Sequence, residues 1–327
     1  MRFIDMHCDT LMNVLFEDPE KMNLYQAPYA AIDFLRMKEA GQMGQFFAAF
    51  MPVERMWQRA KGPMLSDEDY IRTTHDALVR NVEAHDDLIR MAYSGEDAER
   101  NWEDGRMSAF FTMEDGRAVQ GDLGNIKRFY DMGCRALALT WNAKNCFGSP
   151  NSTDSEIMAE GLTDFGKDGV RYMQEIGMLV DVSHLSEGGF WDVAEICTKP
   201  FIASHSNSRA LSPHQRNLSD DQIRALADKG GVTGINFCPA FLNEDITCKD
   251  STAERMADHV MHIIDVGGIE CVGLGSDLDG TSGNMEIDEC SKMHLLEEAL
   301  RRRGLSEDDL SRIFYRNVLR VLKEAVL

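Results

Sequence analysis

The feature that most constrains the fold is a regular alternation of short apolar runs with longer amphipathic segments. The runs are rich in β-branched and aromatic residues, which favour strands, and the segments between them repeat apolar residues at helical spacing. Strands that alternate with helices predict βαβ units and a parallel sheet. The eight expected strands are Arg2–Asp9, Gly44–Pro52, Met107–Glu114, Cys134–Trp141, Met178–His184, Pro200–His205, Gly231–Cys238 and Glu270–Asp277.

The intervening segments carry recognisable helix start signals. Ser66–Ala92 opens with Ser-Asp-Glu, and Thr163–Ile176 opens with Thr-Asp. Ser219 precedes two aspartates at the start of a further helix, and a C-terminal helix is expected over residues 306–325. Serine and threonine at these positions can accept hydrogen bonds from the free backbone amides of a helix start.

Eight strands with helices between them are the number needed for a closed (β/α)8 barrel of the TIM type, which is the α/β fold class that we predict. A doubly wound open sheet is the alternative that the same alternation allows. We expect a single domain over residues 1–327, because the sequence shows no internal repeat, low-complexity segment or linker. Barrels of this kind routinely reach about 250 residues as one domain.

Five of the eight runs end in ionisable side chains, which are costly on a strand buried on both faces unless they are paired or bind metal. The carboxyl ends of barrel strands meet at one face of the molecule, where such residues would converge on a common site. These ends are His7-Cys8-Asp9, Glu114-Asp115, Ser183-His184, Ser204-His205-Ser206 and Ser276-Asp277-Leu278-Asp279.

Imidazole nitrogens and carboxylate oxygens are ligands that zinc and similar divalent ions accept, and one carboxylate can bridge two ions. The residues with this chemistry are His7, Asp9, Glu114, His184 and His205. His7 and Asp9 leave the same face of their strand, while Cys8 faces the helix layer. A histidine at a strand end can equally be a hydrogen-bonded core residue, and His-x-Asp by itself is a weak signal.

Composition and charge exclude some classes of partner. The chain has 55 acidic and 34 basic residues, a net charge of −21, so we expect no nucleic-acid partner. No stretch reaches the roughly 18 apolar residues of a membrane span, so we expect no membrane contact. The first residues lead directly into a strand without the apolar segment of a signal peptide, which favours a cytoplasmic location and eight free cysteines. A homo-oligomer stays open.

With these residues in view, the chain resembles the membrane (renal) dipeptidase family of zinc peptidases, a branch of the amidohydrolase-like barrels. The resemblance runs nearly end to end, and the order of its motifs is more specific than any one of them. Those motifs are Ile4-Asp5-Met6-His7-Cys8-Asp9-Thr10, Thr112-Met113-Glu114-Asp115-Gly116, Leu137-Ala138-Leu139-Thr140-Trp141-Asn142, Val182-Ser183-His184-Leu185-Ser186, Ala203-Ser204-His205-Ser206-Asn207-Ser208, Arg216-Asn217-Leu218-Ser219-Asp220, Gly273-Leu274-Gly275-Ser276-Asp277-Leu278-Asp279-Gly280 and Asn317-Val318-Leu319-Arg320-Val321-Leu322.

The resemblance implies a zinc-dependent dipeptidase with two Zn²⁺ per chain. It implies that His7 and Asp9 hold one zinc, that His184 and His205 hold the other, and that Glu114 bridges them. A hydroxide shared by the two ions would attack the peptide carbonyl.

The same resemblance assigns two residues to the substrate. Arg216 would pair with the C-terminal carboxylate of the dipeptide, which a planar guanidinium can bind through two hydrogen bonds. Asp277 would take the proton of the attacking water and pass it to the leaving amine. Asp279, two residues further on, is the nearest rival for that role.

One position departs from the family pattern. Many relatives have a histidine after the Leu-Thr of the fourth strand, where it contacts the substrate, and here the position is Trp141, followed by Asn142. An indole donates one hydrogen bond but carries no titratable charge. Trp141 could simply pack at the barrel mouth, or its N–H or Asn142 could take over the contact with the substrate.

Two other functions remain open at this stage. Related barrels hydrolyse other amides, lactams and N-acyl amino acids at similar metal sites, and fold does not choose among these substrates. Arg216 together with a glutamate bridge favours a dipeptidase, since many other amidohydrolases bridge with a modified lysine and Cys134–Trp141 contains no lysine. A catalytically weak paralogue that only binds a peptide or metabolite is the third hypothesis, and Trp141 is the one feature that points to it.

Overall fold

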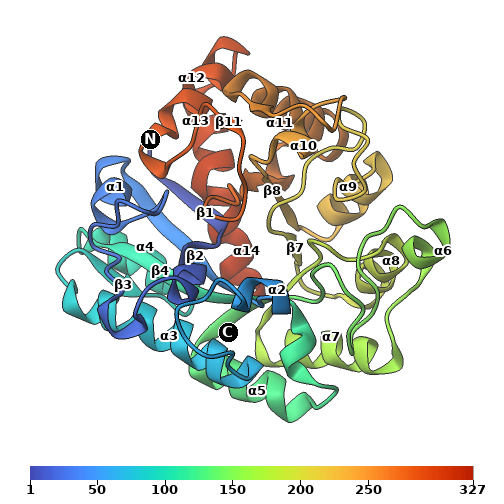
Figure 1. The fold of residues 1–327 in the computed structure, drawn as a ribbon. Coiled ribbons are helices and arrows are strands. Elements are labelled where there is room, and N and C mark those ends of the chain that lie inside the picture. The colour runs from blue at the N-terminus through green and yellow to red at the C-terminus, as the bar shows by residue number, and fades with distance from the viewer. Residues whose placement is uncertain (327) are drawn as a thin grey trace.

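The computed structural model describes residues 1–326. Eight parallel strands close into a barrel, and helices cover its outside (Figure 1). Around the barrel the strands follow the order β2-β1-β10-β8-β7-β6-β5-β4, and pairing between β2 and β4 closes the ring. Each strand lies within or across one of the eight apolar runs, so the barrel prediction is confirmed. The strands are Phe3–Cys8 (β1), Gln42–Phe50 (β2), Met107–Glu114 (β4), Cys134–Ala138 (β5), Leu179–Asp181 (β6), Ile202–Ala203 (β7), Val232–Ile235 (β8) and Val272–Leu274 (β10).

Three short strands were not expected from the sequence. Ile89–Met91 (β3) pairs with the beginning of β4, on the edge that β5 occupies further along. The helix expected over Ser66–Ala92 is therefore too long: it covers Asp67–Ala84 (α3), and its last predicted turns form a turn and β3. Asp250–Ser251 (β9) and Asn284–Met285 (β11) pair with each other outside the barrel.

The helices between the barrel strands begin at the predicted capping residues. The Thr163 side chain accepts from the Gly166 amide, and Ser219 forms a reciprocal capping box with Gln222. The longer helices outside the barrel are α3, Gly95–Glu103 (α4), Leu123–Met132 (α5), Asp164–Ile176 (α7), Glu187–Ile196 (α8), Asp220–Asp228 (α9), Ala253–Gly267 (α11) and His294–Arg302 (α12). Shorter helices are Phe34–Glu39 (α1), Glu54–Trp57 (α2), Ser155–Ala159 (α6) and Pro239–Leu242 (α10).

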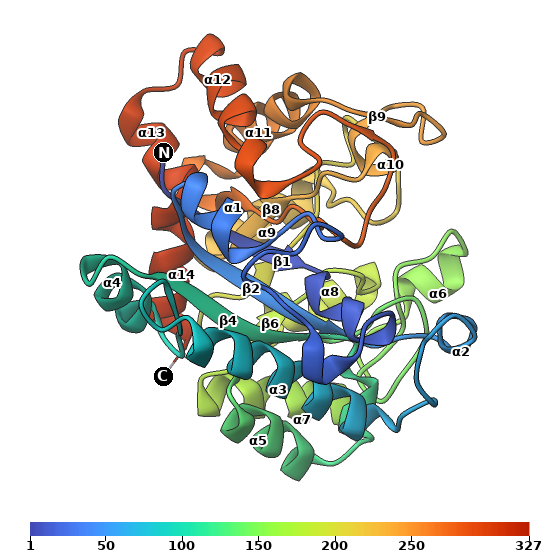
Figure 2. The ribbon, with the colours of Figure 1, turned by 60° about the vertical axis from the view of Figure 1, so that its left-hand side comes forward.

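The C-terminal helix closes one end of the barrel. It runs as Glu307–Ser311 (α13), a π-helical turn over Arg312–Arg316, and Asn317–Ala325 (α14), close to the expected bounds. Apolar side chains of α14 form one buried cluster with barrel residues that include Phe46 and Phe110. Figure 2 shows α14 beside the starts of the strands, with α2, α6 and α10 on the far side. The strand starts are therefore covered by apolar packing, which leaves the carboxyl ends for a polar site.

Among residues 1–326, no helix combines the length and the apolar character that crossing a membrane requires.

Candidate functional site

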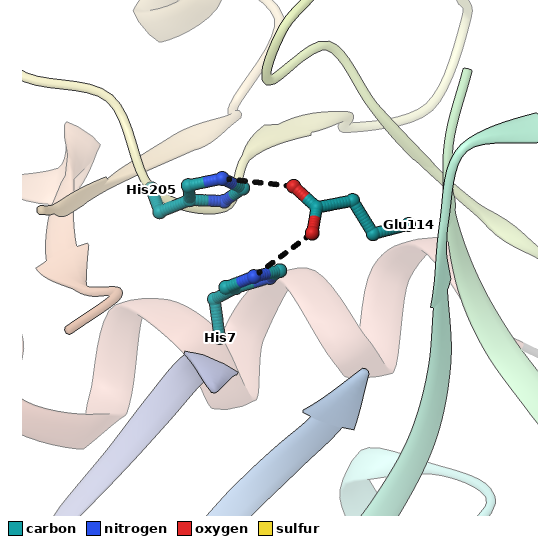
Figure 3. Close-up of side chains that lie close together, drawn as sticks. All are labelled: His7, Glu114 and His205. Carbon is teal, nitrogen blue, oxygen red and sulfur yellow. Dashed lines mark ion pairs between the residues drawn. The ribbon is translucent and has the colours of Figure 1, made fainter. Parts of the chain in front are cut away.

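The carboxyl ends of four strands bring the five expected metal ligands together. His7 lies near the end of β1, Glu114 is the last residue of β4, and His184 and His205 follow β6 and β7. Figure 3 shows His7 and His205 stacked one above the other, each facing one oxygen of the Glu114 carboxylate. Every one of the five, Asp9 included, is buried, with at most 9% of its surface exposed. Barrel closure thus unites residues that are almost 200 positions apart in the chain.

Glu114 occupies the centre of the group. Its Oε2 lies 3.5 Å from His7 Nε2, and its Oε1 lies 2.9 Å from His184 Nε2 and 3.3 Å from His205 Nε2. Asp9 Oδ1 is 3.7 Å from His7 Nε2. Ligand atoms around a tetrahedral zinc stand about 3.3 Å apart, because each bond is about 2.0–2.1 Å long. The separations around Glu114 therefore suit atoms that bind a metal ion together.

An irregularity in β1 directs His7 and Asp9 to the site. Asp5 pairs with Gln45 and Cys8 pairs with Phe47, so Met6 and His7 together oppose a single residue of β2. Such a bulge adds one residue and changes which face the following side chains occupy. Met6 joins the apolar cluster at the closed end, whereas Cys8 lies in the larger cluster that includes the helix layer.

Two of the imidazoles have a polar partner at Nδ1 and turn their Nε2 atoms towards Glu114. Asn142 Oδ1 lies 3.2 Å from His184 Nδ1, and Ser204 Oγ lies 2.7 Å from His205 Nδ1. With Nδ1 protonated in both rings, the two Nε2 atoms present lone pairs to each other at 3.1 Å and to Glu114 Oε1. Lone pairs that face a carboxylate repel one another unless a cation binds them, so these residues fit a divalent metal.

The other side of the site gives an independent indication of the same kind. His7 Nε2 and Asp9 Oδ1 are buried and have no hydrogen-bond partner. A buried polar atom without a partner costs about 1–3 kcal/mol. They belong to the two residues that the family resemblance assigns to one metal, and a cation bound between them would satisfy both atoms.

The electrostatics reflect an excess of negative charge. Burial by itself lowers the pKa of His7, but the neighbouring Glu114 and Asp9 carboxylates outweigh it and raise that pKa well above its usual value. Burial raises the pKa of Asp9 to about 7, and Glu114 contributes. Burial lowers the pKa of His184 to about 4 and also lowers that of His205, so both rings stay neutral. Neutral imidazoles beside carboxylates are the state in which such ligands bind metal.

Asp277 is held at the edge of this group in an unusual backbone conformation. Its φ is +60°, a left-handed value, and its Oδ2 accepts a hydrogen bond of 2.9 Å from Asn236 Nδ2. Its Oδ1 faces His7 Nε2 at 4.0 Å, and burial raises its pKa to about 6. Gly280 makes this approach possible, since a Cβ there would lie 2.0 Å from Asp9 Oδ2 and 2.5 Å from Asp277 Oδ1. A carboxyl group with a pKa near 6 can exchange protons near neutral pH.

Asp279, the rival for the proton-transfer role, is engaged elsewhere. Its Oδ2 accepts from Thr10 Oγ1 at 2.6 Å, and its Oδ1 accepts from the Ala31 amide at 2.7 Å. Both oxygens of Asp279 are therefore occupied by hydrogen bonds to the segments that contain Thr10 and Ala31. Asp279 also does not line the cavity beside the expected ligands. The geometry favours Asp277 over Asp279.

A cavity of about 290 Å³ opens beside the ligands, and Trp141 and Asn142 both line it. Trp141 packs edge-on against Phe50, with ring centroids 4.8 Å apart. Its position at the cavity wall combines the two roles considered from the sequence, packing and access to a substrate. The lining residues are Asp9, Met12, Phe50, Arg55, Met56, Glu114, Trp141, Asn142, His184, Cys238, Phe241, Asp277, Gly280 and Thr281.

Arg216 lies under the wall of this cavity and is not one of its lining residues. Its guanidinium donates to Ser206 Oγ and to the His205 carbonyl, both at 3.1 Å, and its Nε has no partner. Phe241, which lines the cavity, lies 5.5 Å from the guanidinium. Arg216 is only 5% exposed, and no carboxylate among residues 1–326 forms an ion pair with it. A buried guanidinium without a counter-charge is costly, so an anionic partner would stabilise it.

Several contributors to the site were missed from the sequence. Asn236 follows β8 directly and holds Asp277, but it is an amide, and the search for ionisable strand ends passed over it. A search for any polar side chain at a strand end would have found it. Arg55 and Phe241 lie on the short helices α2 and α10, where no periodic pattern marks the direction of their side chains.

Comparison with known proteins identifies relatives over most of the chain. A family model described as membrane dipeptidase, peptidase family M19, matches residues 1–327. A Klebsiella pneumoniae protein encoded in the pqqA 5′ region is 36% identical over 255 residues, which are 76% of this chain and 93% of that protein. Dipeptidase tcpJ of Claviceps purpurea is 33% identical over 250 residues, which are 76% of this chain but only 58% of the fungal protein.

Solved structures share the whole fold. The crystal structure of dipeptidase AC, a family M19 metallopeptidase, matches with a TM-score of 0.89 at 27% identity and covers 100% of this chain and 99% of that one. A Rhodobacter sphaeroides metallopeptidase, bound to a phosphinate mimic of L-Ala-D-Ala, matches with a TM-score of 0.88 at 27% identity and covers 99% of both chains. The chain belongs to the membrane dipeptidase family, peptidase family M19, and is a metallo-dipeptidase.

Proposed function

We propose that this dipeptidase works with two zinc ions held on opposite sides of Glu114. His7 and Asp9 would hold one ion, and His184 and His205 the other. The observation that carries the proposal is the arrangement of the ligand atoms: His7 Nε2 and Asp9 Oδ1 are buried and unpartnered, and the Nε2 atoms of His184 and His205 face one carboxylate oxygen. When bound, two such ions supply Lewis acidity and lower the pKa of a water molecule.

The chain's own residues would orient the substrate and move the proton. Asp277, fixed by Asn236 and facing His7, is placed to accept a proton from the attacking water and to deliver it to the leaving amine. Burial raises the pKa of Asp277 to about 6, which suits both steps. Ions bound nearby would lower that pKa, so the operating value belongs to the whole group and not to Asp277 alone.

Arg216 would bind the free carboxylate of the dipeptide. Its guanidinium is buried without a counter-ion, and Phe241 lies over it at the cavity wall. Reaching it requires a substrate whose carboxylate lies close to the scissile bond, which limits the length of the peptide on that side. The cavity of about 290 Å³ is small enough to favour dipeptides over longer chains.

The Rhodobacter relative was solved with a mimic of an L,D-dipeptide, and we extend that possibility to this chain. The experiment is zinc content by elemental analysis, followed by hydrolysis of a panel of L,L- and L,D-dipeptides before and after chelation. We expect about two zincs per chain and cleavage that stops on chelation and returns with added zinc. Two bound metals without cleavage of any dipeptide would redirect the search to other amides or lactams. No bound zinc after reconstitution would refute the binuclear site.

A further inference from the structure

Two buried aspartates join neighbouring strands of the barrel just below the candidate metal site. Asp181, at the end of β6, accepts the amides of Ser183 and Ser204 on Oδ1, both at 2.9 Å, and the Ser204 hydroxyl on Oδ2 at 2.5 Å. Asp181 is 4% exposed and does not line the cavity. One carboxylate thus fastens β6 to β7 immediately before His205.

Asp5 makes the same arrangement between β1 and β10. Its Oδ1 accepts the amides of His7 at 3.3 Å and Ser276 at 2.8 Å, and its Oδ2 accepts the Ser276 hydroxyl at 2.6 Å. In both cases the aspartate binds the amide two residues ahead on its own strand, then the amide and hydroxyl of a serine on the next strand. The barrel therefore contains two equivalent Asp–Ser clamps.

The two clamps differ in what else the serine contacts. Ser204 Oγ lies 2.7 Å from His205 Nδ1, whereas Ser276 Oγ accepts the backbone amide of Leu278 at 3.2 Å and contacts no imidazole. The residue after Ser276 is Asp277, whose side chain bonds to Asn236 instead. Only the Asp181 clamp reaches the imidazole of an expected metal ligand, because the Asp5 clamp contacts His7 through its backbone amide and carbonyl alone.

The donor and the acceptor of each hydrogen bond in this series follow from the protons that the three groups carry. An ionised aspartate can only accept, so the single hydroxyl proton of Ser204 must go to Asp181. Ser204 then offers only lone pairs, which requires His205 Nδ1 to carry the ring proton. The other ring nitrogen, Nε2, is left without a proton and faces Glu114. A metal-binding imidazole is commonly fixed in this way by a hydrogen bond to its second nitrogen.

We propose that Asp181 and Ser204 are positioning residues that fix the tautomer and orientation of the His205 ring, so that its Nε2 is ready to bind metal. The proposal rests on the proposed function, because it assumes that His205 is a metal ligand. The Asp5–Ser276 clamp has the same strand-joining hydrogen bonds without the imidazole, and it therefore supplies a matched control within the same protein.

The first test compares Ser204→Ala with Ser276→Ala. Both variants lose one hydroxyl and one bond to a buried aspartate, so we expect the melting temperatures of the metal-free proteins to fall by similar amounts. Zinc affinity, measured by competition with a chromophoric chelator, should weaken roughly 10–100-fold in Ser204→Ala and stay within about threefold in Ser276→Ala. Equal zinc affinities in the two variants would show that the clamps only join strands, and would overturn the proposal.

The second test keeps the shape of the carboxylate. Asp181→Asn can turn its amide towards Ser204 and donate to it, which frees the hydroxyl proton for His205 Nδ1 and moves the ring proton to Nε2. We expect zinc affinity to weaken roughly tenfold or more, and only slightly in the control Asp5→Asn. In metal-free protein labelled at histidine with ¹⁵N, the His205 ring should be protonated at Nδ1 in the wild type and shift towards Nε2 in Asp181→Asn.

An unchanged ¹⁵N pattern together with unchanged zinc affinity in Asp181→Asn would also overturn the proposal. This failure is distinguishable from failure of the proposed function. A wild-type protein that binds two zincs and cleaves dipeptides, with variants that bind zinc equally well, rejects only the positioning role. A wild-type protein that binds no zinc rejects the binuclear site itself.

Discussion

Hydrogen bonds at one ring nitrogen of a histidine determine which of its two nitrogens can bind a metal ion. Asn142 and Ser204 occupy the Nδ1 atoms of His184 and His205, which leaves the Nε2 atoms for metal. Residue types at strand ends were enough to predict which five side chains meet at one site, because imidazoles and carboxylates are costly to bury unless they are paired or bind metal. The hydrogen-bond partners were not predictable, since Asn142 and Ser204 are ordinary polar residues until the fold places them.

Arg216→Met tests the role of the buried guanidinium. Without it, the C-terminal carboxylate of a dipeptide has no counter-charge, so we expect kcat/KM on free dipeptides to fall by about two to three orders of magnitude. This follows from a cost of about 2–5 kcal/mol for removing one partner of a buried charge pair. Steady-state kinetics on a C-terminally amidated dipeptide serve as the control, where the variant should resemble the wild type. An equal loss on both substrates would show that Arg216 acts on the structure of the site instead.

Trp141→His introduces the histidine that the family resemblance led us to expect at this position. Trp141 packs against Phe50 at the cavity wall and is not one of the metal ligands. We therefore expect zinc content to stay at the wild-type value while the order of preference across a dipeptide panel changes. Trp141→Phe keeps an aromatic ring next to Phe50 without the N–H, which separates packing from hydrogen bonding. Loss of zinc from Trp141→His, measured by elemental analysis, would contradict the placement of this residue.

At the scale of elements, strands were predicted more reliably than helix ends. Met107–Glu114 was predicted with its observed bounds, because a continuous apolar run in a parallel barrel has few alternatives. The helix predicted over Ser66–Ala92 extends into β3, where a buried Ile89 pairs with the start of β4. A strand of only three residues shortly after an amphipathic helix is too short for its hydrophobic pattern to be distinguished from that of the helix. The bulge at Met6 and His7 also depends on pairing with β2, which sequence alone does not reveal.

His259 anchors α11 to the loops beside it and makes stability depend on pH. Its Nδ1 accepts the Ser208 amide, and its Nε2 donates to the Leu242 carbonyl, both at 3.1 Å, so the neutral ring is required. Burial lowers its pKa to about 4, compared with about 6.5 in the unfolded chain. Between these values the unfolded chain binds more protons, so stability that is complete above pH 6.5 is lost as the pH falls towards 4.

The full effect of His259 is about 3 kcal/mol, from 1.36 kcal/mol per pKa unit. We expect His259→Asn to be less stable than the wild type at pH 7.5 but to lose less stability between pH 6.5 and 4. Urea unfolding of chelated protein measures both quantities without interference from metal loss. The exposed His294 on α12 provides a control, and His294→Asn should keep the wild-type pH dependence. A His259→Asn curve parallel to that of the wild type would refute this assignment.

On the scale of the whole molecule, closure of the barrel is what creates the site. The expected ligands come from β1, β4, β6 and β7, and no two of these strands are joined by a short hairpin. Counting eight strands was therefore enough to predict that the ligands converge, because closure brings every carboxyl end to one face. The depth of Arg216 and the shape of the cavity depend on loops between residues 53 and 66 and between 206 and 218, whose paths follow no periodic rule.

Removal of metal tests whether bound ions stabilise the closed barrel. Without cations, the buried carboxylates of Asp9 and Glu114 remain close to the half-buried Asp277, and the Nε2 atoms of His184 and His205 lie 3.1 Å apart. A ligand present at about 1,000 times its Kd stabilises the native state by about 4 kcal/mol. We expect chelation to lower the melting temperature of this 327-residue chain by about 5–15 °C, reversibly on zinc addition. In Glu114→Gln, which lacks the proposed bridging carboxylate, chelation should lower the melting temperature much less. Equal melting temperatures for zinc-loaded and chelated wild type would mean that bound metal does not hold the four strands together.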